Sequence, residues 1–411
     1  MLASVACGAL LIAAVTATHT ARAQNFSSGS TGADGALDFS NLAPGTTVEF
    51  NPDAFSPPLD PERDNVYHFT TINVPAGVTV NLSAKYLNGP VYWLATGAVQ
   101  INGTLDLNGQ DGQHSNTLIN SGSRFPSLPG AGGFGGGIGG AAPQVGHGPG
   151  GGGLPVRSDG DAGHAGHATG VGCGVSPGQS YGNAFLIPLV GGSGGGGAYS
   201  GAAGGAGGGA IQLVSSVSIT VNGVIQATGG RSGNFGFNLP NGGGGSGGAI
   251  RLVAPTVGGT GTLLANGGPF RHGGRCAADG RIRLEAFRHT FTGGSDPGMH
   301  RTFPNALNVP STPPSSVRVV SIAGVAVPPN PTGSFELPDV NIDASAATAV
   351  VIEGRFVPVG TVVRLHLVSE DGADQIVDSA PLAGTLEQTS ATASVVFPRG
   401  FTRGFARAVW R

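Results

Sequence analysis

Short runs in which apolar and polar residues alternate are the most regular feature of the chain. Such alternation places every second side chain on one face of a β-strand. Three of these runs follow a glycine and read alike: residues 209–214 (GAIQLV), 248–253 (GAIRLV) and 280–285 (GRIRLE). From residue 24 onward, no stretch of useful length has the period of an amphipathic helix. The pattern therefore predicts an all-β chain with an internal repeat.

A second repeated run supports the same interpretation. Residues 99–109 (VQINGTLDLNG) align without gaps to residues 219–229 (ITVNGVIQATG), and residues 257–267 form a degenerate third copy. The central Asn-Gly supplies the positive φ of a tight bend, and the flanking alternation buries every second side chain.

The spacing of the first repeat indicates its structural class. Its equivalent isoleucines, Ile211, Ile250 and Ile282, are separated by 39 and then by 32 residues. Repeats of this length are stacked units that cannot bury a core singly. Because each unit holds only β-segments and turns, we expect a β-solenoid, specifically a right-handed parallel β-helix.

Glycine accounts for 76 of the 411 residues, far above the usual share of roughly 7%. Its runs, such as residues 150–153, 191–197 and 242–248, lie between the β-segments, and residues 110–208 form a long excursion between two repeat copies. Strands without side chains can lie close together as extended, threefold helices that hydrogen-bond sideways. We expect a polyglycine II-like loop layer; the alternative is a set of disordered loops.

Residues 1–23 resemble a secretory signal peptide with cleavage after Ala23, which predicts a secreted or cell-surface protein. A loosely held leader would follow at 24–60 and become ordered near Leu37 and Phe39. The solenoid would cover 61–292, and a proline-rich linker 293–315. No second apolar run of about 20 residues is present, so no membrane span is expected.

Residues 316–411 have an ordinary composition and contain seven or eight short β-runs. In one of them, Val363, Leu365 and Leu367 share a face, while Arg364 and His366 share the other. Short strands at this spacing predict an immunoglobulin-like β-sandwich that lacks an internal disulfide.

Composition limits the partners. The net charge is −3, and one lysine stands against 19 arginines without a basic run, so nucleic-acid binding is not expected. In an oxidising compartment, Cys173 and Cys276 are expected to form a disulfide, with two free thiols as the alternative.

The densest polar cluster is a candidate metal site. Asp159, Asp161, His164 and His167 could hold a transition metal or, through the carboxylates, calcium. The spacing fits no complete ligand signature, and polar residues that decorate a glycine loop are the commoner explanation. No resident cofactor is otherwise expected.

A candidate ligand site comes from the outward positions of the first repeat. Gln212, Arg251 and Arg283, with Arg281 and Glu285 beside them, would form a basic stripe able to hold an anionic glycan. The alternative is a solvated face without a ligand.

No catalytic residue is assigned. The outward position of the second repeat holds Asp106, Gln226 and Leu264, which is not the row of acids that a β-helix lyase or hydrolase would carry. Tyr92 and Trp93 could stack on a sugar, but a place in the core is the simpler interpretation.

Residues 30–37, 69–78, 88–97 and 247–252 resemble a loose group of glycine-rich secreted proteins from environmental Gram-negative bacteria. That group brings no known activity. The glycine runs followed by Ala-Ile are also similar to the glycine-rich domain of anaplastic-lymphoma-kinase-type receptors and to the glycine-rich tips of phage adhesins. This likeness implies packed polyglycine helices and a binding role.

The expected function is non-enzymatic: adhesion, or a structural role in an envelope or matrix, with an extracellular polysaccharide as the expected partner. One alternative is a carbohydrate-active enzyme of the β-helix class. Another is a self-assembling filament subunit, which an uncapped final coil at residues 281–286 would favour.

Overall fold

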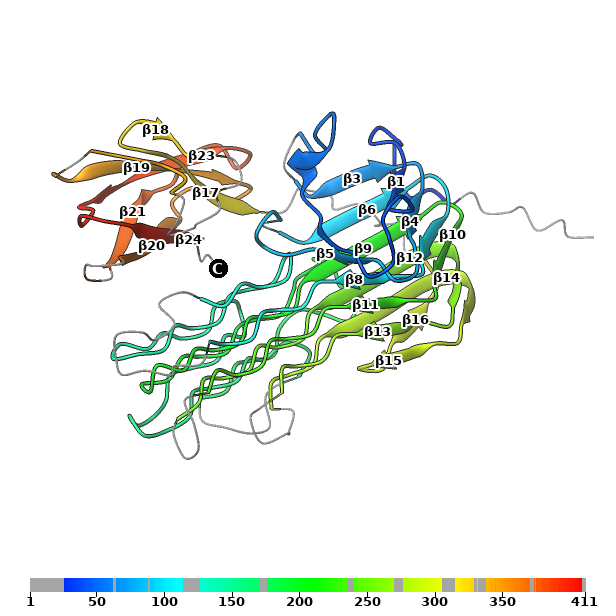
Figure 1. Ribbon diagram of the computed structural model, residues 1–411, viewed down its shortest axis with the longest axis horizontal. Coiled ribbons are helices and arrows are strands. Elements are labelled where there is room, and N and C mark those ends of the chain that lie inside the picture. The colour runs from blue at the N-terminus through cyan, green and yellow to red at the C-terminus, as the bar shows by residue number, and fades with distance from the viewer. Residues whose placement is uncertain are drawn as a thin grey trace, which may run out of the picture.

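The computed structural model describes residues 26–61, 64–87, 89–113, 126–169, 176–234, 240–269, 276–304, 315–328, 331, 338–343, 345–369, 373 and 375–408. These residues are almost entirely β-strand, turn and extended chain, with one 3-10 turn at Pro52–Ala54 (Figure 1). The predicted all-β class is confirmed. The predicted signal peptide lies outside the described residues.

The described residues between 37 and 302 form six successive coils of parallel strands and the first strand of a seventh. The strands are, in order of coil, β1 (Leu37–Asp38) and β2 (Thr47–Glu49); β3 (Val66–Phe69), β4 (Ile72–Val74) and β5 (Thr79–Asn81); β6 (Val91–Ala95), β7 (Val99–Ile101) and β8 (Thr104–Asp106); β9 (Ala210–Ser215), β10 (Ser218–Val221) and β11 (Val224–Gln226); β12 (Ala249–Gly259) and β13 (Thr262–Leu264); β14 (Arg281–Phe291) and β15 (Gly294–Asp296); and β16 (His300–Thr302), which stacks on β14 and begins the next coil.

The register between coils follows the repeats found in the sequence. Ile211 pairs with Ile250, and Ile250 pairs with Ile282. Likewise, Ile219 on β10 pairs with Val99 on β7 and with Val257 on β12. Strands β2, β5, β8, β11, β13 and β15 form a second parallel sheet. The alignment of the repeats therefore predicted which strands are neighbours and in which register.

The inward side chains form one continuous apolar core, and its N-terminal end is closed by aromatic rings. The ring of Phe50 lies 5.2 Å from that of Tyr67 and 5.1 Å from that of Trp93, between centroids. All three side chains are buried, and Tyr92 is buried on the opposite side of β6. Trp93 is thus a core residue and not a sugar-stacking platform.

The coils extend further in both directions than the sequence indicated. At the N-terminus, β1 and β2 pair with β4 and β5, so the predicted loose leader supplies the first coil. At the other end, β15 pairs with β13 and β16 pairs with β14, inside the predicted linker. Because β16 pairs with residues 283–285, that part of the β14 coil is covered, which removes the observation that would have favoured the filament alternative.

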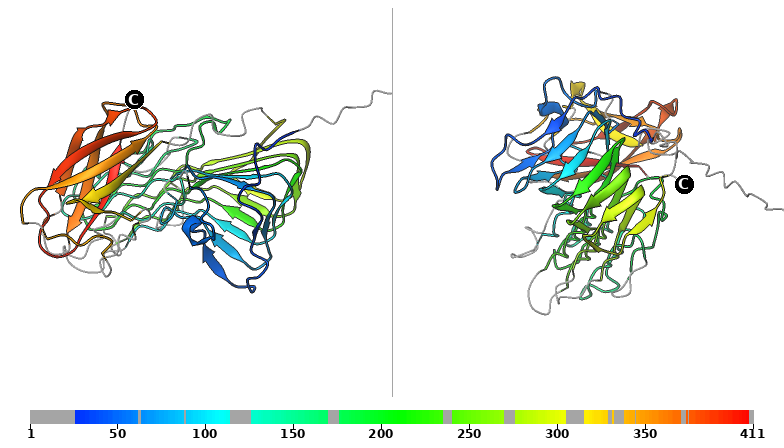
Figure 2. Two further views of the ribbon diagram at one scale, coloured as in Figure 1. Left: turned by 90° about the horizontal axis from the view of Figure 1, so that it is seen from above. Right: turned by 90° about the vertical axis from the view of Figure 1, so that its right-hand side faces the viewer.

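The glycine-rich segments leave the coils at one corner and pack beside one another (Figures 1 and 2). Successive amides of residues 203–209 donate to three neighbours in turn. Ala203, Ala206 and Gly209 donate to residues 107–113, Gly204 and Gly207 to residues 134–137, and Gly205 and Gly208 to residues 243–246. The cycle repeats every three residues, as in an extended threefold helix without internal hydrogen bonds.

Carbonyls of the same segment accept from residues 192–195 and 230–233, so segment 203–209 is bonded to five neighbouring segments. A Cβ added at Gly204 would collide with the carbonyl oxygen of Gly195, and one at Gly207 with that of Gly192. The close approach requires glycine at these positions. The described segments therefore form an ordered layer and not a set of solvated loops. We call this layer the glycine block; it consists of residues 107–113, 130–153, 161–167, 191–209, 227–233 and 241–248.

Residues 315–408 include a separate unit of two antiparallel sheets. One sheet contains β17 (Ser316–Ile322), β18 (Val325–Ala326), β19 (Thr348–Arg355), β22 (Ala383–Gly384) and β23 (Thr389–Val395). The other contains β20 (Val362–Ser369), β21 (Gln375–Pro381) and β24 (Thr402–Ala408). Val363, Leu365 and Leu367 face a core shared by both sheets, as the alternation predicted.

Within the described residues, no helix has the length and apolar character needed to cross a membrane.

Candidate functional site

The row of side chains predicted to hold a ligand is aligned as the repeat indicates, but it is not on an open surface. Gln212, Arg251 and Arg283 occupy equivalent positions on β9, β12 and β14. Their exposed fractions are only 1%, 2% and 6%. The expectation of a solvated outward face is therefore wrong.

Glu285 connects the row into one buried network. The Nε of Arg251 donates to Oε1 of Glu285 at 2.9 Å, and the Nε of Arg283 donates to the same oxygen at 2.7 Å. Nη1 of Arg251 also donates to Oε1 of Gln212 at 2.8 Å. Buried charges persist when they are paired and hydrogen-bonded in this way.

The row is buried because residues 181–189 of the long excursion lie over it. Nη1 of Arg283 donates to the carbonyl of Ala184 at 3.2 Å, and its guanidinium carbon lies 5.1 Å from the centroid of the Phe185 ring. Arg281, which is partly exposed, donates to the carbonyls of Tyr181 at 2.8 Å and Ala168 at 3.3 Å. These backbone carbonyls already accept from guanidinium N–H groups that would otherwise be able to donate to a glycan.

The residues of the predicted metal site do not converge. Asp161, His164 and His167 lie along one extended segment, three residues apart. At a rise of about 3.1 Å per residue, neighbours in this row are about 9 Å apart, too far to share an ion. Asp159 is exposed beyond the row. Among the described residues, no group of three or more His, Cys, Asp or Glu side chains is placed to hold a metal.

These side chains instead bond the backbone of the glycine segment beside them. Oδ1 of Asp161 accepts from the backbone N–H of Asn241 at 2.7 Å. Nδ1 of His164 accepts from the N–H of Gly244 at 2.8 Å, and Nδ1 of His167 lies 2.6 Å from the carbonyl oxygen of Gly247, to which it donates. The threefold period places one such bond in every turn.

Burial keeps both imidazoles neutral. It lowers the pKa of His164 to about 4, against a smaller opposing effect of Asp161. It also lowers the pKa of His167 to about 4, although the bond to Gly247 acts in the opposite direction. His167 stacks on Tyr181, with ring centroids 4.6 Å apart. The two histidines are therefore structural groups of the glycine block.

Cys276 is part of a disulfide. Its predicted partner, Cys173, lies outside the described residues, so the pairing of Cys173 with Cys276 stays a prediction.

A cleft of about 1300 Å³ lies between the first coils and the C-terminal unit. Asp60 lines it, and burial raises the pKa of Asp60 to about 7, more than the N–H groups of Asp64 and Asn65 lower it. Both carboxylate oxygens already accept from those amides, at 3.0 and 2.8 Å. Asp60 thus shapes the turn before β3, and it is also a titratable group in a cleft.

His147 of the glycine block meets the C-terminal unit at the same cleft. Its ring centroid lies 6.0 Å from that of His366 and 5.1 Å from that of Phe405, and His366 stacks on Phe405 at 4.6 Å. Burial lowers the pKa of His147 to about 3 and that of His366 to about 4, with Arg407 adding to both effects. His366 is therefore not on a solvated face, unlike the exposed Arg364 beside it.

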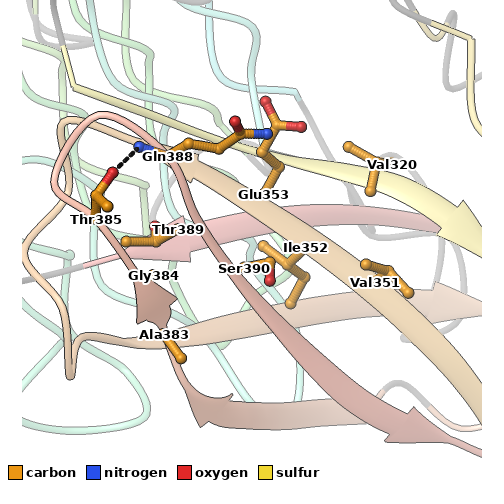
Figure 3. A pocket seen from close by; sticks show the side chains of 10 residues that line it. All are labelled: Val320, Val351, Ile352, Glu353, Ala383, Gly384, Thr385, Gln388, Thr389 and Ser390. Carbon is orange, nitrogen blue, oxygen red and sulfur yellow. Dashed lines mark hydrogen bonds between the residues drawn. The ribbon is translucent and has the colours of Figure 1, made fainter.

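A smaller hollow of about 520 Å³ lies on the C-terminal unit between β19 and the β22–β23 hairpin (Figure 3). Glu353 is its charged residue, and its carboxylate is paired with Arg355 at 3.1 Å and Arg318 at 3.5 Å. The other side chains that line it are small, apolar or neutral. This arrangement offers polar contacts but no pair of groups suited to acid–base chemistry.

The outer face of the second sheet carries two columns of residues, only one of which was expected from the repeat. Asp106, Gln226 and Leu264 do share a column, as predicted. Two residues earlier in each strand, a second column is formed mainly by threonine. The hydroxyl column is Thr47, Thr79, Thr104, Val224, Thr262 and Gly294; the carboxylate–amide column is Glu49, Asn81, Asp106, Gln226, Leu264 and Asp296.

The sequence signal for this surface was one position of the aligned repeats. Thr104 and Thr262 occupy it in two copies, and Val224 occupies it in the other. Comparison with known proteins adds no functional residue. No protein-family model, curated protein or solved structure matches the chain.

Proposed function

We propose that the protein is a secreted or cell-surface, non-enzymatic scaffold that acts in adhesion or in matrix structure and binds an extracellular polysaccharide. The signal-like residues 1–23 support secretion. In this proposal the coils wind as a right-handed β-helix and the C-terminal unit is immunoglobulin-like, as the sequence pattern favours.

The glycine block is the observation that carries the proposal. Ordering glycine costs more backbone entropy than ordering any other residue, so the block persists only through many simultaneous sideways bonds. Such bonding stiffens segments that would otherwise be flexible, and it fixes them to one another at every turn. A stiff, cross-bonded body suits attachment to an extended polymer.

A sedimentation and hydrolysis assay tests the proposal. The secreted full chain is incubated with a panel of soluble and insoluble polysaccharides, and bound protein and new reducing ends are measured in the same tubes. We expect binding to at least one polymer without release of reducing ends. Release of reducing ends or unsaturated products would refute the non-enzymatic function.

One observation favours the enzymatic alternative: the carboxyl group of Asp60, with a pKa of about 7, lines the large cleft. A carboxylic acid that remains protonated near neutral pH can act as a general acid. If product is released, Asp60→Asn should abolish it, while Asp53→Asn in the same cleft should retain it. If both variants keep full activity, Asp60 is not the acid.

A further inference from the structure

We propose that the outer face of β2, β5, β8, β11, β13 and β15 binds a neutral, hydroxyl-rich polysaccharide that is presented as an ordered, flat array. This inference rests on the proposed function and specifies the binding face and the class of ligand.

The geometry of this face is periodic. The strands pair in parallel without a register shift, so each column repeats at the strand spacing of about 4.8 Å. Six strands give columns roughly 24 Å long. Side chains of both columns are exposed or partly exposed, and Figure 1 shows β5, β8, β11, β13 and β15 side by side. The face is thus a regular surface and not a pocket.

The chemistry of the columns suits sugar hydroxyls. Threonine hydroxyls donate and accept, and the amide and carboxylate side chains of the second column supply further acceptors and donors. Threonine is β-branched, so few rotamers are lost when it orders against a ligand. Asn81 donates to Glu49 at 3.1 Å, and Asn266 donates to Asp296 at 3.0 Å, which fixes part of the second column before binding.

The charge of the face decides between neutral and acidic polymers. Its two columns contain the carboxylates of Glu49, Asp106 and Asp296 and neither lysine nor arginine. Like charges would repel an anionic polymer. The guanidinium row that would suit an acidic glycan lies on another face, beneath residues 181–189. The ligand inferred for this face is therefore a neutral polysaccharide, in place of the anionic glycan expected from the sequence.

The test compares matched threonines on two faces. Thr104 lies in the hydroxyl column, whereas Thr220 lies at an outward position of β10 on the neighbouring face and has similar partial exposure. Full-length wild-type protein and the variants T79V/T104V, T104R, T220V and T220R are sedimented with microcrystalline β-1,4-glucan, with chitin and with soluble alginate. Thermal melting confirms that each variant folds.

We expect wild-type protein to bind glucan or chitin and not alginate, T104R and T79V/T104V to bind at least tenfold more weakly, and both Thr220 variants to bind as wild type. If Thr104 variants bind like wild type, the face is wrong and the proposed function stands. If wild type binds only alginate, the ligand class is wrong. If it binds no polysaccharide, the proposed function fails as well. In that case, a change in the shape of growing ice crystals would identify ordered water as the ligand of this face.

Discussion

At the residue scale, the glycine block depends on which positions have no side chain. Gly204 and Gly207 each abut a neighbouring carbonyl, whereas Ala203 and Ala206, which precede them in sequence, have room for a Cβ and are buried. The glycine runs allowed an ordered layer to be predicted. They did not allow the neighbours to be predicted, because segments without side chains carry no complementary pattern that identifies partners.

Replacing Gly204 by alanine should destabilise the protein strongly. The added methyl group would meet the carbonyl of Gly195, and backbone must move to admit it. We expect a loss of about 1–3 kcal/mol in the free energy of unfolding, as for other overpacked sites. The control is Gly298→Ala, where a Cβ has no neighbour within 4 Å. Equal denaturation midpoints for the two variants would contradict the packing described.

The buried histidines should make stability depend on pH. The folded pKa of His164 and of His167 is about 4, below the ordinary value of 6.5. Between these values the unfolded chain binds more protons, so the stability is complete above pH 6.5 and declines as pH falls toward 4. Each imidazole contributes a loss on the order of 3 kcal/mol over this range.

The variant His164→Asn tests this dependence, since an amide oxygen can still accept from the N–H of Gly244 but does not titrate. Denaturant unfolding at pH 7 and pH 5 measures the change. Between these two pH values, the free energy of unfolding of this variant should fall by roughly 2 kcal/mol less than that of wild type. His300→Asn replaces an exposed side chain and serves as the control. An unchanged pH dependence in His164→Asn would rule out this source of acid sensitivity.

At the element scale, the repeats predicted the strand neighbours and their register but not the burial of the Arg251 row. Alignment shows that Gln212, Arg251 and Arg283 stack, because register is a property of the repeat. The cover of Arg283 comes from Ala184 and Phe185, and Ala184 lies 99 residues before it in sequence, in a segment without a repeat. No local pattern in the chain specifies that contact.

Glu285→Gln tests the buried network within these strands. The change leaves the guanidinium groups of Arg251 and Arg283 without the carboxylate that both contact, and breaking a buried pair typically costs about 3–5 kcal/mol. The same chemical change in an exposed pair, Asp378→Asn opposite Arg364, should cost much less, because solvent screens an exposed ion pair. Urea unfolding of both variants checks the difference, and similar losses would show that the network is not buried in solution.

At the scale of the whole molecule, the coils, the glycine block and the C-terminal unit form one scaffold in this account. Composition predicted the order of these parts along the chain, but it did not predict where the coils begin and end. Strands β1 and β2 escaped prediction because two- and three-residue strands show too little alternation to detect. The threonine column became visible only when register aligned one residue from each coil.

Amide hydrogen exchange on the full-length protein tests the central claim most directly, which is that the glycine segments form a bonded block. Peptides covering residues 203–209 and 243–248 contain few apolar side chains, but their amides are bonded to neighbouring segments. We predict that they exchange as slowly as the peptide covering β9. Exchange at the rate of an unprotected chain would show that these segments are solvated loops and would remove the stiff body on which the proposed function rests.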